Sequence, residues 1–471
     1  MKNQISQLIF LALSILSINL AAQTNPSSIN QRNDILLPLE NNERSPCISQ
    51  AEYENIELRC KENIQKYNID QSLNKLSPGS VLLNWPLKAS PKLKDCSYYY
   101  MSAFVDQNIN PTAFQDYSCG TRTYDGHTGT DISTWPFNFY KLDNDLVEVV
   151  AAAGGTILDK HDGEFDKNCG TNTLSANYLI IQHADGSQAN YWHMKKNSLT
   201  KKTIGQKIEA GEFIGIVGSS GNASGPHLHF EVWAGNTKAT RVDPYAGTCN
   251  TLNASSWWNA QHTYKETSVT KVSTNSTDIV LPPCPETETL NEQDTFKIPF
   301  QGPGLSPGYA KFYVFFKDEI AGLTADMNIL NPDGSVFANW TTSSTMDGKV
   351  RAAGFSKKLP VVAGNYIFKA NYNGLTCSKS FTIVTTTNTN EINSTFHSKI
   401  YPNPSNGNFT LECKQLDGGH FQLFDLLGNI ICSNEIQGSI NPIQLQIPTG
   451  IYIYKLSEKN QIKDRGKLII E

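Results

Sequence analysis

The stretch GPHLHFEVW, residues 225–233, decides how the central part of this chain folds. Apolar residues alternate with others along it, which predicts a strand with one face on a core. The residues of the core face are Leu228, Phe230 and Val232. His227 and His229 lie on the opposite face, ~7 Å apart along the backbone at a rise of ~3.4 Å per residue. This separation suits one metal ligand and one neighbouring acid–base group better than two ligands of one ion.

A second phrase, HTGTD, places His127 four residues before Asp131. In a flat strand the two side chains would lie ~13 Å apart, and Gly129 with its flanking threonines disfavours a helix. We therefore expect a bend or bulge at Gly129 that folds Asp131 back toward His127. Two imidazoles and one carboxylate favour zinc, and a fourth position left to water is typical of a catalytic site.

Six of the nine histidines lie between residues 127 and 229, so a histidine-based site belongs to this region. A third phrase, NYWH, contributes His193. An isolated H-x-H or H-x-x-x-D pattern more often belongs to surface residues without a function. Here both patterns occur together, with a histidine between them and glycine-rich turns beside each, and this combination favours a functional site. His161 and His183 are interpreted as turn or supporting histidines. In a strand Tyr191 would lie on the same face as His193. Packing is a simpler explanation for this tyrosine than a place in the site.

The composition is that of folded protein, with 39% hydrophobic and 18% charged residues. The formal net charge of −5 offers no basic face, so neither nucleic acid nor an anionic membrane is expected as a partner. Residues 1–22 have the pattern of an export signal, because one lysine precedes the apolar core LIFLALSIL and small residues follow it. No later stretch approaches a membrane span, so none is expected in the mature chain.

A length of 471 residues exceeds what one core can fill, so several domains are expected. From Val81 onward, short apolar runs between Gly, Asn, Asp and Pro indicate β structure, and only residues 47–77 show helical spacing. The expected parts are a signal peptide at 1–22, a linker and possible pro-segment at 23–96, a β domain at 97–250, a connecting segment at 251–280, a β-sandwich-like module at 281–386, a linker at 387–398 and a last β region at 399–471. Strands of the β domain are expected at Val147–Ala152, Gly155–Leu158, Tyr178–His183, Ala189–His193, Phe213–Val217 and His227–Trp233.

Ten cysteines fit an oxidising compartment, where an even number suggests disulfides. Sequential pairing is one simple arrangement, and free thiols remain an alternative for Cys413 and Cys432. No C-x-x-C pair occurs, which argues against a thiolate zinc site or a redox centre. No cysteine has a histidine context typical of a thiol protease, and G-x-S-x-G is absent.

Taken in order, HTGTDI, VVAAAGGTI, YLIIQHADG, YWHM, GEFIGIVGSSGNASGPHLHFEV and DPY resemble the lysostaphin/LytM-type peptidases of the M23 family, which include the β-lytic endopeptidases. The resemblance covers roughly residues 120–245. It implies that 97–250 is an antiparallel β-sheet zinc peptidase domain, with one Zn²⁺ held by three ligands: His127, Asp131 and His229. It also implies that His193 and His227 are the catalytic pair.

The resemblance further implies a secreted zinc metalloendopeptidase that hydrolyses peptide bonds with a zinc-activated water. Its expected substrate is a bacterial cell-wall peptide cross-link or a glycine-rich protein. An insertion at 133–146 departs from the family pattern and is expected to shape the substrate groove, and 162–175 is longer than the minimal domain. The alternatives are a non-catalytic cell-wall-binding protein, or an adhesin with a vestigial peptidase domain whose function lies in 281–386.

The last region, from YPNPSNGNFTL through FQLFDLLGNII and GIYIYKL to KLIIE, resembles the type A sorting domains of the type IX secretion system. This implies that the secretion machinery is a partner, and that the chain is exported through periplasm and outer membrane to the cell surface or the medium. The alternative, one more β module, has the same fold. The expected fold is thus all-β and multidomain, with a lysostaphin/LytM-type domain followed by small β-sandwich-like domains.

Overall fold

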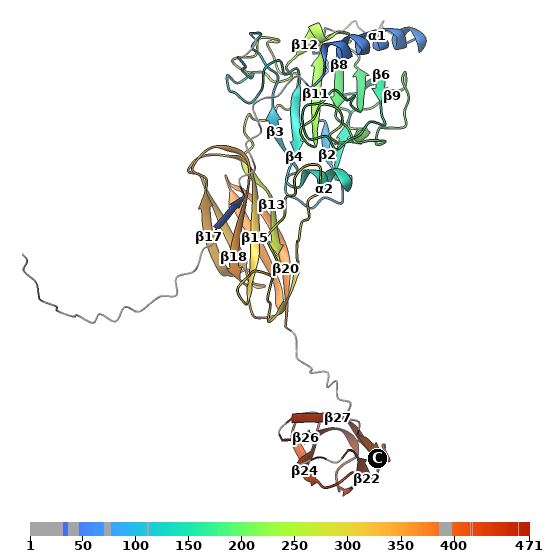
Figure 1. Cartoon of the computed structure of the whole chain (residues 1–471), viewed down its shortest axis with the longest axis vertical. Coiled ribbons are helices and arrows are strands. Elements are labelled where there is room, and N and C mark those ends of the chain that lie inside the picture. The colour runs from blue at the N-terminus through green and yellow to red at the C-terminus, as the bar shows by residue number, and fades with distance from the viewer. Residues whose placement is uncertain are drawn as a thin grey trace, which may run out of the picture. The chain divides into compact units, whose positions relative to one another are not determined.

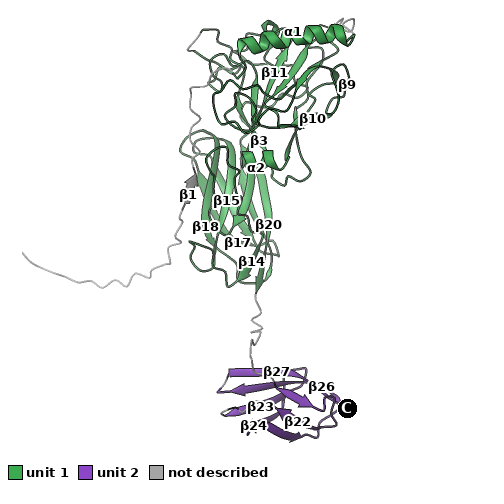
Figure 2. Ribbon diagram, turned by 45° about the vertical axis from the view of Figure 1, so that its right-hand side comes forward, with its two compact units in different colours: residues 1–385 green, residues 386–471 purple. Residues whose placement is uncertain are grey.

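A computed structural model of the chain describes residues 32–35, 47–69, 77–110, 113–385, 398–414, 416, 418–459 and 461–471. The export signal expected at 1–22 and nearly all of the linker expected at 387–398 lie outside these residues. The described chain is mostly β-strand, as the sequence predicts. It forms two compact units, residues 1–385 and residues 386–471 (Figures 1 and 2).

An eight-stranded antiparallel sheet forms the centre of the histidine-bearing domain in the first unit. Its strands, in spatial order, are β3 (Tyr99–Ala103), β4 (Thr130–Thr134), β11 (His227–Trp233), β8 (Gln188–Trp192), β7 (Tyr178–Gln182), β6 (Gly155–His161) and β9 (Lys207–Ile208), with β12 (Arg241–Val242) beside β11. A second sheet contains β10 (Phe213–Ile216), β5 (Val147–Val150) and β2 (Leu87–Ala89). All six strands expected between residues 147 and 233 are present.

The two faces of β11 are buried in different ways. Its apolar residues join the core between the two sheets, and these are Leu228, Phe230 and Val232. The opposite face is covered by α1 (Gln50–Lys66), which packs Tyr53 against the ring of Trp233. Because α1 covers this face, His229 and Glu231 are fully buried. The sequence pattern predicts only that the imidazoles lie opposite the core face, and α1 is what buries that face.

The sequence predicts the long helix of this domain but not its two short helical segments. The helix expected within 47–77 is α1, which begins after Ser49, whose Oγ accepts a hydrogen bond from the Glu52 N–H at 3.2 Å. The helix α2 (Asn138–Asp143) lies in the 133–146 insertion and has no side-chain cap, and η1 (Lys238–Thr240) is a single 3₁₀ turn. Such short turns depend on tertiary packing, so no sequence period marks them.

A β-sandwich follows the histidine-bearing domain in the first unit. One sheet contains β1 (Arg32–Ile35), β18 (Gly348–Lys358), β15 (Tyr309–Glu319) and β13 (Ser268–Asn275). The other contains β14 (Thr295–Ile298), β20 (Leu375–Thr385), β19 (Gly364–Tyr372), β16 (Thr324–Leu330) and β17 (Val336–Ser343). Aromatic residues dominate the core of this sandwich, among them Phe312, Trp340 and Phe368.

Two strands of the sandwich lie where connections were expected. The first, β1, falls in the 23–96 linker, and β13 falls in the 251–280 connecting segment. In β13 nearly every residue is buried and the register shifts between Val269 and Lys271, so the strand shows no period-two pattern. The pairing of β1 with β18 joins segments more than three hundred residues apart, and local sequence carries no signal for it.

Three disulfides connect distant parts of the first unit, and they are Cys96–Cys377, Cys119–Cys249 and Cys169–Cys284. None joins cysteines that are neighbours in the sequence, so the simple sequential arrangement is wrong. Two of the three bonds connect the sandwich to the histidine-bearing domain. The packing of the two domains, and not the order of the cysteines in the sequence, brings these pairs together. The free thiols among the described residues are Cys47, Cys60, Cys413 and Cys432.

Buried charged and apolar contacts also join the histidine-bearing domain to the sandwich. Asp95 lies 2.7 Å from the Lys141 Nζ of α2 and 2.6 Å from the Lys271 Nζ of β13. The indole N–H of Trp135 donates to the Phe316 carbonyl at 3.0 Å. These contacts place the start of the sandwich beside the 133–146 insertion.

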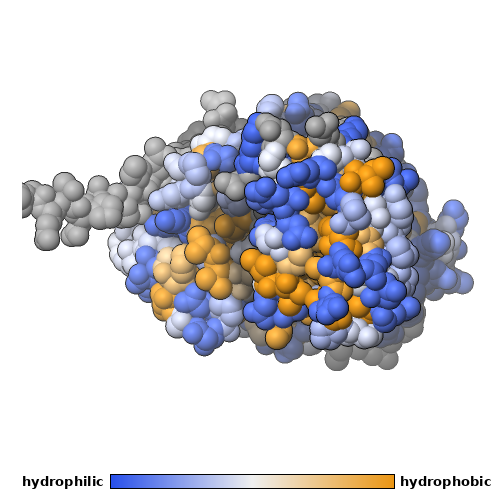
Figure 3. All heavy atoms as spheres, turned by 90° about the horizontal axis from the view of Figure 1, so that it is seen from below, coloured by the Kyte–Doolittle hydropathy of each residue, from blue (hydrophilic) through white to orange (hydrophobic). Residues whose placement is uncertain are grey.

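The second unit is a separate β domain. One sheet contains β21 (Lys399–Tyr401), β22 (Asn408–Glu412) and β25 (Ile440–Gln444), and the other contains β24 (Ile430–Ile436), β23 (Gly419–Phe424), β26 (Gly450–Glu458) and β27 (Gln461–Ile470). Several apolar side chains of this domain are exposed, such as Leu427 at 89%. Figure 3 shows apolar groups scattered among polar ones on the face that it presents. No helix in the described part of the chain is long and apolar enough to cross a membrane.

Candidate metal centre

The adjacent strands β4 and β11 bring the distant ligand candidates together. Asp131 and His229 are direct partners in this antiparallel pair. His127 precedes β4, and the backbone bends at Gly129 between them. A Cβ atom at Gly129 would lie 2.7 Å from Nε2 of His229 and 2.8 Å from the carbonyl oxygen of Phe230. Only glycine therefore lets the chain turn this close to β11.

The donor atoms of these three side chains converge on one point. Nε2 of His127 lies 3.2 Å from Nδ1 of His229 and 3.1 Å from Oδ1 of Asp131. The remaining pair, His229 Nδ1 and Asp131 Oδ1, is separated by 2.9 Å. Nitrogen and oxygen ligands at ~2.0–2.2 Å from a tetrahedral zinc ion lie ~3.3 Å from one another. The side chains thus have the spacing that one such ion requires.

The surroundings hold two of these groups in the state that a metal needs. Nδ1 of His127 lies 2.6 Å from the Phe104 carbonyl oxygen and can only donate to it, which leaves the Nε2 lone pair facing the other ligands. Burial raises the pKa of Asp131, but interactions with the imidazoles of His127 and His227 outweigh burial and hold that pKa well below its ordinary value. The carboxyl is therefore ionised, as ligation requires.

A fourth donor, the Sγ of Cys47, completes the only group of described residues suited to a metal. The four donor atoms lie within 4.8 Å of one another, and Sγ is 3.8 Å from Nδ1 of His229. The lack of C-x-x-C pairs disfavours a thiolate zinc site, but this prediction is wrong to leave out a lone cysteine such as Cys47, whose thiol lies among the donors. Cys47 lies eighty residues before His127, and no motif surrounds it, so only the docking of α1 reveals its position.

The expected catalytic pair lies next to this centre and outside it. Nε2 of His227 is 3.7 Å from Oδ1 of Asp131, and the rings of His193 and His227 are 4.6 Å apart between centroids. Nδ1 of His193 donates to the Ser220 carbonyl at 2.7 Å, and Nδ1 of His227 donates to the Gly225 carbonyl at 2.8 Å. Both rings therefore present Nε2 toward the centre.

The ring of His193 reaches the centre because its backbone adopts an unusual conformation. The strand β8 ends at Trp192, and His193 has a φ of 63°, in the left-handed region that disfavours a bulky residue. This turn directs its ring away from the face of Tyr191, whose hydroxyl instead accepts a hydrogen bond from the Ala152 N–H at 2.8 Å inside the core. Strained residues of this kind concentrate at functional sites. Burial lowers the pKa of His193, and the neighbouring Cys47 sulfur opposes that shift.

The remaining histidines of the domain stay away from the centre. Nε2 of His161 is 2.7 Å from Glu164 at the half-exposed end of β6. His183 is hydrogen-bonded to the Gly154 carbonyl at 2.9 Å in the turn after β7. The structure thus brings together all five sequence-predicted site residues, namely His127, Asp131, His193, His227 and His229, and adds Cys47. Their roles as ligands and catalysts stay predictions.

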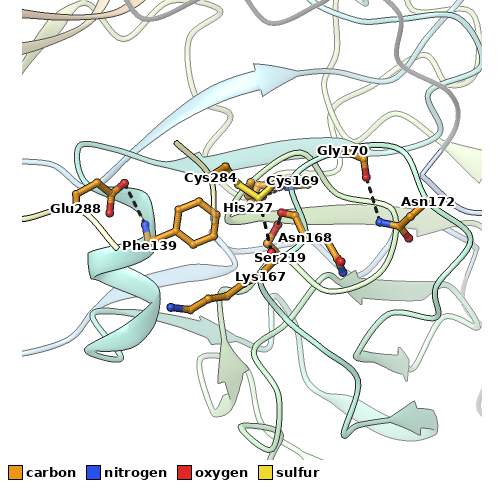
Figure 4. The surroundings of a disulfide bond; sticks show 11 residues. Phe139, Lys167, Asn168, Cys169, Gly170, Asn172, Ser219, His227, Cys284 and Glu288 are labelled. Atoms are coloured by element: carbon orange, nitrogen blue, oxygen red, sulfur yellow. Dashed lines mark hydrogen bonds between the residues drawn. A yellow bond between two sulfur atoms is a disulfide. The ribbon is translucent and has the colours of Figure 1, made fainter. Parts of the chain in front are cut away.

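The two insertions and the start of the sandwich form one rim of the site. In Figure 4, the Cys169–Cys284 disulfide lies beside His227. The same figure shows Glu288 of the sandwich accepting a hydrogen bond from the Phe139 N–H of α2. A cavity of about 60 Å³ opens next to Asp131 and is otherwise lined by Tyr100, Ser102, Ser133, Asn138, Ser224, Gly225, Pro226 and His227.

Two parts of the chain match known families. Residues 126–244 match peptidase family M23, and residues 399–471 match the secretion system C-terminal sorting domain. The chain therefore carries one domain of each kind. The sorting domain marks the chain for export, to the cell surface or the medium.

The relatives match this chain over short stretches. Cell division protein DipM of Caulobacter vibrioides is 34% identical over 104 residues, 21% of this chain and 17% of that protein. Peptidoglycan DD-endopeptidase ShyA of Vibrio cholerae is 43% identical over 58 residues, 12% of this chain and 13% of that protein. The chain thus spans less than a fifth of the length of either protein. The catalytic domain of lysostaphin from Staphylococcus simulans aligns at 19% identity over 30% of this chain and 85% of that chain, with a TM-score of 0.20, too low to carry an argument.

Proposed function

We propose, from the peptidase family M23 domain that the chain carries, that this protein is an exported zinc endopeptidase acting on the peptide cross-links of bacterial cell walls. The observation that supports it most is the convergence of three donor atoms, from His127, Asp131 and His229, at distances of 2.9–3.2 Å. Imidazole and carboxylate donors at this spacing suit zinc. A zinc ion bound there would polarise the scissile carbonyl and lower the pKa of a water from ~15.7 toward ~7.

His193 and His227 are the groups that would move protons. Each donates its Nδ1–H to a backbone carbonyl, so that the neutral form of the ring carries its lone pair on Nε2. A neutral ring would accept a proton at Nε2 from the attacking water, and the other ring, protonated at Nε2, would donate to the tetrahedral oxygen or to the leaving amine. The geometry is compatible with either ring in either role.

The substrate proposal rests on the space beside these rings. The cavity next to Asp131 suits a small side chain because its volume is only about 60 Å³, and three serines and a glycine are among its nine lining residues. Glycine and alanine, which have the smallest side chains, fit this space best. One relative bears the name peptidoglycan DD-endopeptidase, and cross-links rich in such residues are the substrate class that we propose, with glycine-rich proteins second.

The sorting domain fits this role. A cell-wall peptide lies outside the cytoplasm, and residues 399–471 mark the chain for export. We propose the type IX secretion machinery as the partner that recognises this domain. The alternative, a binding protein or adhesin with a vestigial peptidase domain, has no need of His193 and His227 beside a complete ligand set.

The test measures free amino groups released from purified peptidoglycan by the full chain. Because Cys47 lies at the metal centre, the zinc-loaded Cys47→Ala chain is used alongside the wild type. We expect release by Cys47→Ala, reduced ~10²–10⁴-fold when His227→Ala or His193→Ala is added while zinc is retained. The matched control is His161→Ala, which removes a histidine away from the centre and should leave release unchanged. A zinc-loaded Cys47→Ala chain that cleaves neither peptidoglycan nor oligoglycine peptides contradicts the proposal and favours the vestigial domain.

A further inference from the structure

The single sulfur in the candidate metal centre comes from outside the peptidase domain. Residues 126–244 alone supply three donors, from His127, Asp131 and His229, and leave a fourth position open. Cys47 belongs to the turn that precedes α1, and its thiol fills that position. A separate segment of the chain thus contributes the group that closes the site.

The position of this sulfur matches that of a ligand. Sγ of Cys47 is 3.8 Å from Nδ1 of His229. A sulfur at ~2.3 Å and a nitrogen at ~2.0–2.1 Å from one tetrahedral zinc ion would lie ~3.6 Å apart. The hydroxyl of Tyr124 lies 2.8 Å from the same sulfur, and as a donor it would stabilise a thiolate there.

We propose that Cys47 is the fourth ligand of the metal and that the segment carrying it, residues 47–69, keeps the enzyme latent until it is removed. This proposal rests on the proposed peptidase function and names the regulation of the same site. A bound thiolate occupies the position at which water and substrate must meet the metal. The chain as synthesised is then an inactive precursor.

A purely structural zinc site would explain the four donors but not their neighbours. His193 and His227 are both buried, point Nε2 toward the centre and contribute no donor to the group of four. The backbone of His193 is held in the left-handed region to place its ring there. A closed structural site needs neither ring, whereas a catalytic site that is temporarily closed needs both.

The segment is held on the domain by polar contacts next to the ligands. The hydroxyl of Tyr53 lies 2.8 Å from Oγ1 of Thr128, the residue after His127. The same hydroxyl donates to Glu231, two residues after His229, at 3.2 Å. Tyr53 of α1 thus contacts Thr128 and Glu231, which lie close in the sequence to two of the ligands. Docking of α1 and closure of the metal centre are therefore one event.

Other contacts hold the length of α1 on the sheet. Arg59 forms an ion pair with Asp159 of β6 at 3.0 Å, and Glu57 accepts a hydrogen bond from the Lys238 N–H at 2.9 Å. Apolar residues of the segment complete the interface with the sheet, namely Ile48, Tyr53, Ile56, Cys60 and Ile69. With this many contacts, the thiol would seldom leave while the segment stays attached.

Release begins when another protease hydrolyses one peptide bond on the C-terminal side of residue 69. That step consumes one water molecule. The segment is then held only by the metal bond and by noncovalent contacts, those of β1 with β18 included. When the segment departs, the bond between the sulfur and the metal breaks, the thiolate takes up a proton from solvent, and water fills the vacated position. No electrons are exchanged, so no oxidant or reductant is needed.

The first test measures how fast each free thiol of the folded full chain reacts with iodoacetamide, with and without zinc, by mass spectrometry of the peptides. We expect zinc to slow alkylation of Cys47 by at least about tenfold. Two thiols serve as controls, since Cys60 is buried on α1 outside the group of four donors and Cys432 is partly buried in the other unit. Equal rates at Cys47 with and without zinc, or equal slowing at Cys60, would overturn the proposal.

The second test compares Cys47→Ala with Cys60→Ala. In the cobalt-loaded wild type and in Cys60→Ala we expect a thiolate-to-cobalt charge-transfer band in the near ultraviolet, and its loss in Cys47→Ala. In peptidoglycan cleavage, Cys47→Ala should be at least about tenfold more active than wild type, because a site that is mostly closed loses activity in proportion. A cobalt spectrum without this band in the wild type contradicts the ligand assignment.

These outcomes separate the two proposals. If zinc protects Cys47 but no variant cleaves peptidoglycan, the assignment of Cys47 as a ligand stands and the proposed peptidase function is wrong. Equal cleavage by wild type and Cys47→Ala would support the peptidase and overturn latency.

Discussion

His229 and Asp131 are direct partners across β11 and β4, and their side chains meet with Nδ1 and Oδ1 2.9 Å apart. The register of one strand pair therefore sets the distance between two ligands that are far apart in the sequence. A shift of one residue in either strand would turn the side chain of that strand to the other face of the sheet. His127 and Cys47, in contrast, reach the centre from outside the strands.

Substitutions should divide the histidines of the domain into two classes by metal content. Replacing His127, Asp131 or His229 by alanine removes a donor, and zinc affinity should fall more than ~100-fold. His193→Ala and His227→Ala should change zinc affinity by less than that, because neither ring belongs to the converging donors. Competition with a chromogenic chelator measures this, with His161→Ala as the control. Full zinc retention in His229→Ala would contradict the ligand set.

Gly129→Ala should damage the centre without touching any donor. The added Cβ would lie 2.7 Å from Nε2 of His229 and 2.8 Å from a backbone oxygen that cannot move away freely. We expect a loss of ~1–3 kcal/mol in the free energy of unfolding and weaker zinc binding. Gly170→Ala is the matched control, since nothing lies within 4 Å of its added Cβ, and it should cost less than ~0.5 kcal/mol. Equal effects of the two substitutions in urea unfolding would argue against the close approach.

The disulfide at the rim should stabilise the fold without contributing to the metal site. Cys169 and Cys284 are 115 residues apart, and closing a loop of this length contributes ~2–4 kcal/mol. A variant with both residues changed to serine should lose this much and still bind one zinc. Cys432→Ser, which removes a free thiol, is the comparison for unfolding curves. Zinc loss in the double variant would mean that the rim supports the ligands directly.

A carboxylate between the two domains of the first unit should make stability depend on acid. Burial raises the pKa of Glu266, but a hydrogen bond from His262 and the charge of Lys317 outweigh burial and lower it to about 2. A depressed folded-state pKa contributes stability above the unfolded value of about 4.5, and this contribution disappears as pH falls toward about 2. Glu266→Gln should therefore lose ~1–3 kcal/mol at pH 7 and approach the wild type below pH 4.

The comparison for this prediction is Glu212→Gln. Glu212 pairs with Lys202 at 2.6 Å on the surface, where an ion pair contributes ~0–1 kcal/mol. Urea unfolding of both variants at pH 7, 5 and 3 measures the difference. A Glu266→Gln deficit that stays constant from pH 7 to pH 3 would rule out this carboxylate as its source.

The sequence predicts the parts of the site that depend on local periodicity and misses those that depend on docking. Alternation in β11 predicts which residues face the core, and the poor helix propensity around Gly129 predicts the bend. The position of Cys47 depends on how α1 lies across the sheet, which no local pattern encodes. The left-handed backbone of His193 is likewise set by its surroundings, because sequence alone continues the strand through it.

The same distinction explains the disulfide pairing and the two strands that the sequence does not predict. Three disulfides connect segments that only the folded domains bring together, so cysteine order could not give their pairing. Burial of nearly every residue and a register shift hide β13, and β1 depends on a distant partner strand. Local sequence patterns predict the chemistry of the site, but they do not predict contacts between distant segments.

X-ray absorption at the zinc edge of the full-length chain tests the central claim most directly, because it counts the donors around the metal. We expect one zinc per chain with one sulfur at ~2.3 Å and three nitrogen or oxygen donors at ~2.0–2.2 Å, and a spectrum without sulfur in Cys47→Ala. A wild-type chain that binds no zinc, or whose zinc has only nitrogen and oxygen neighbours, would contradict the account.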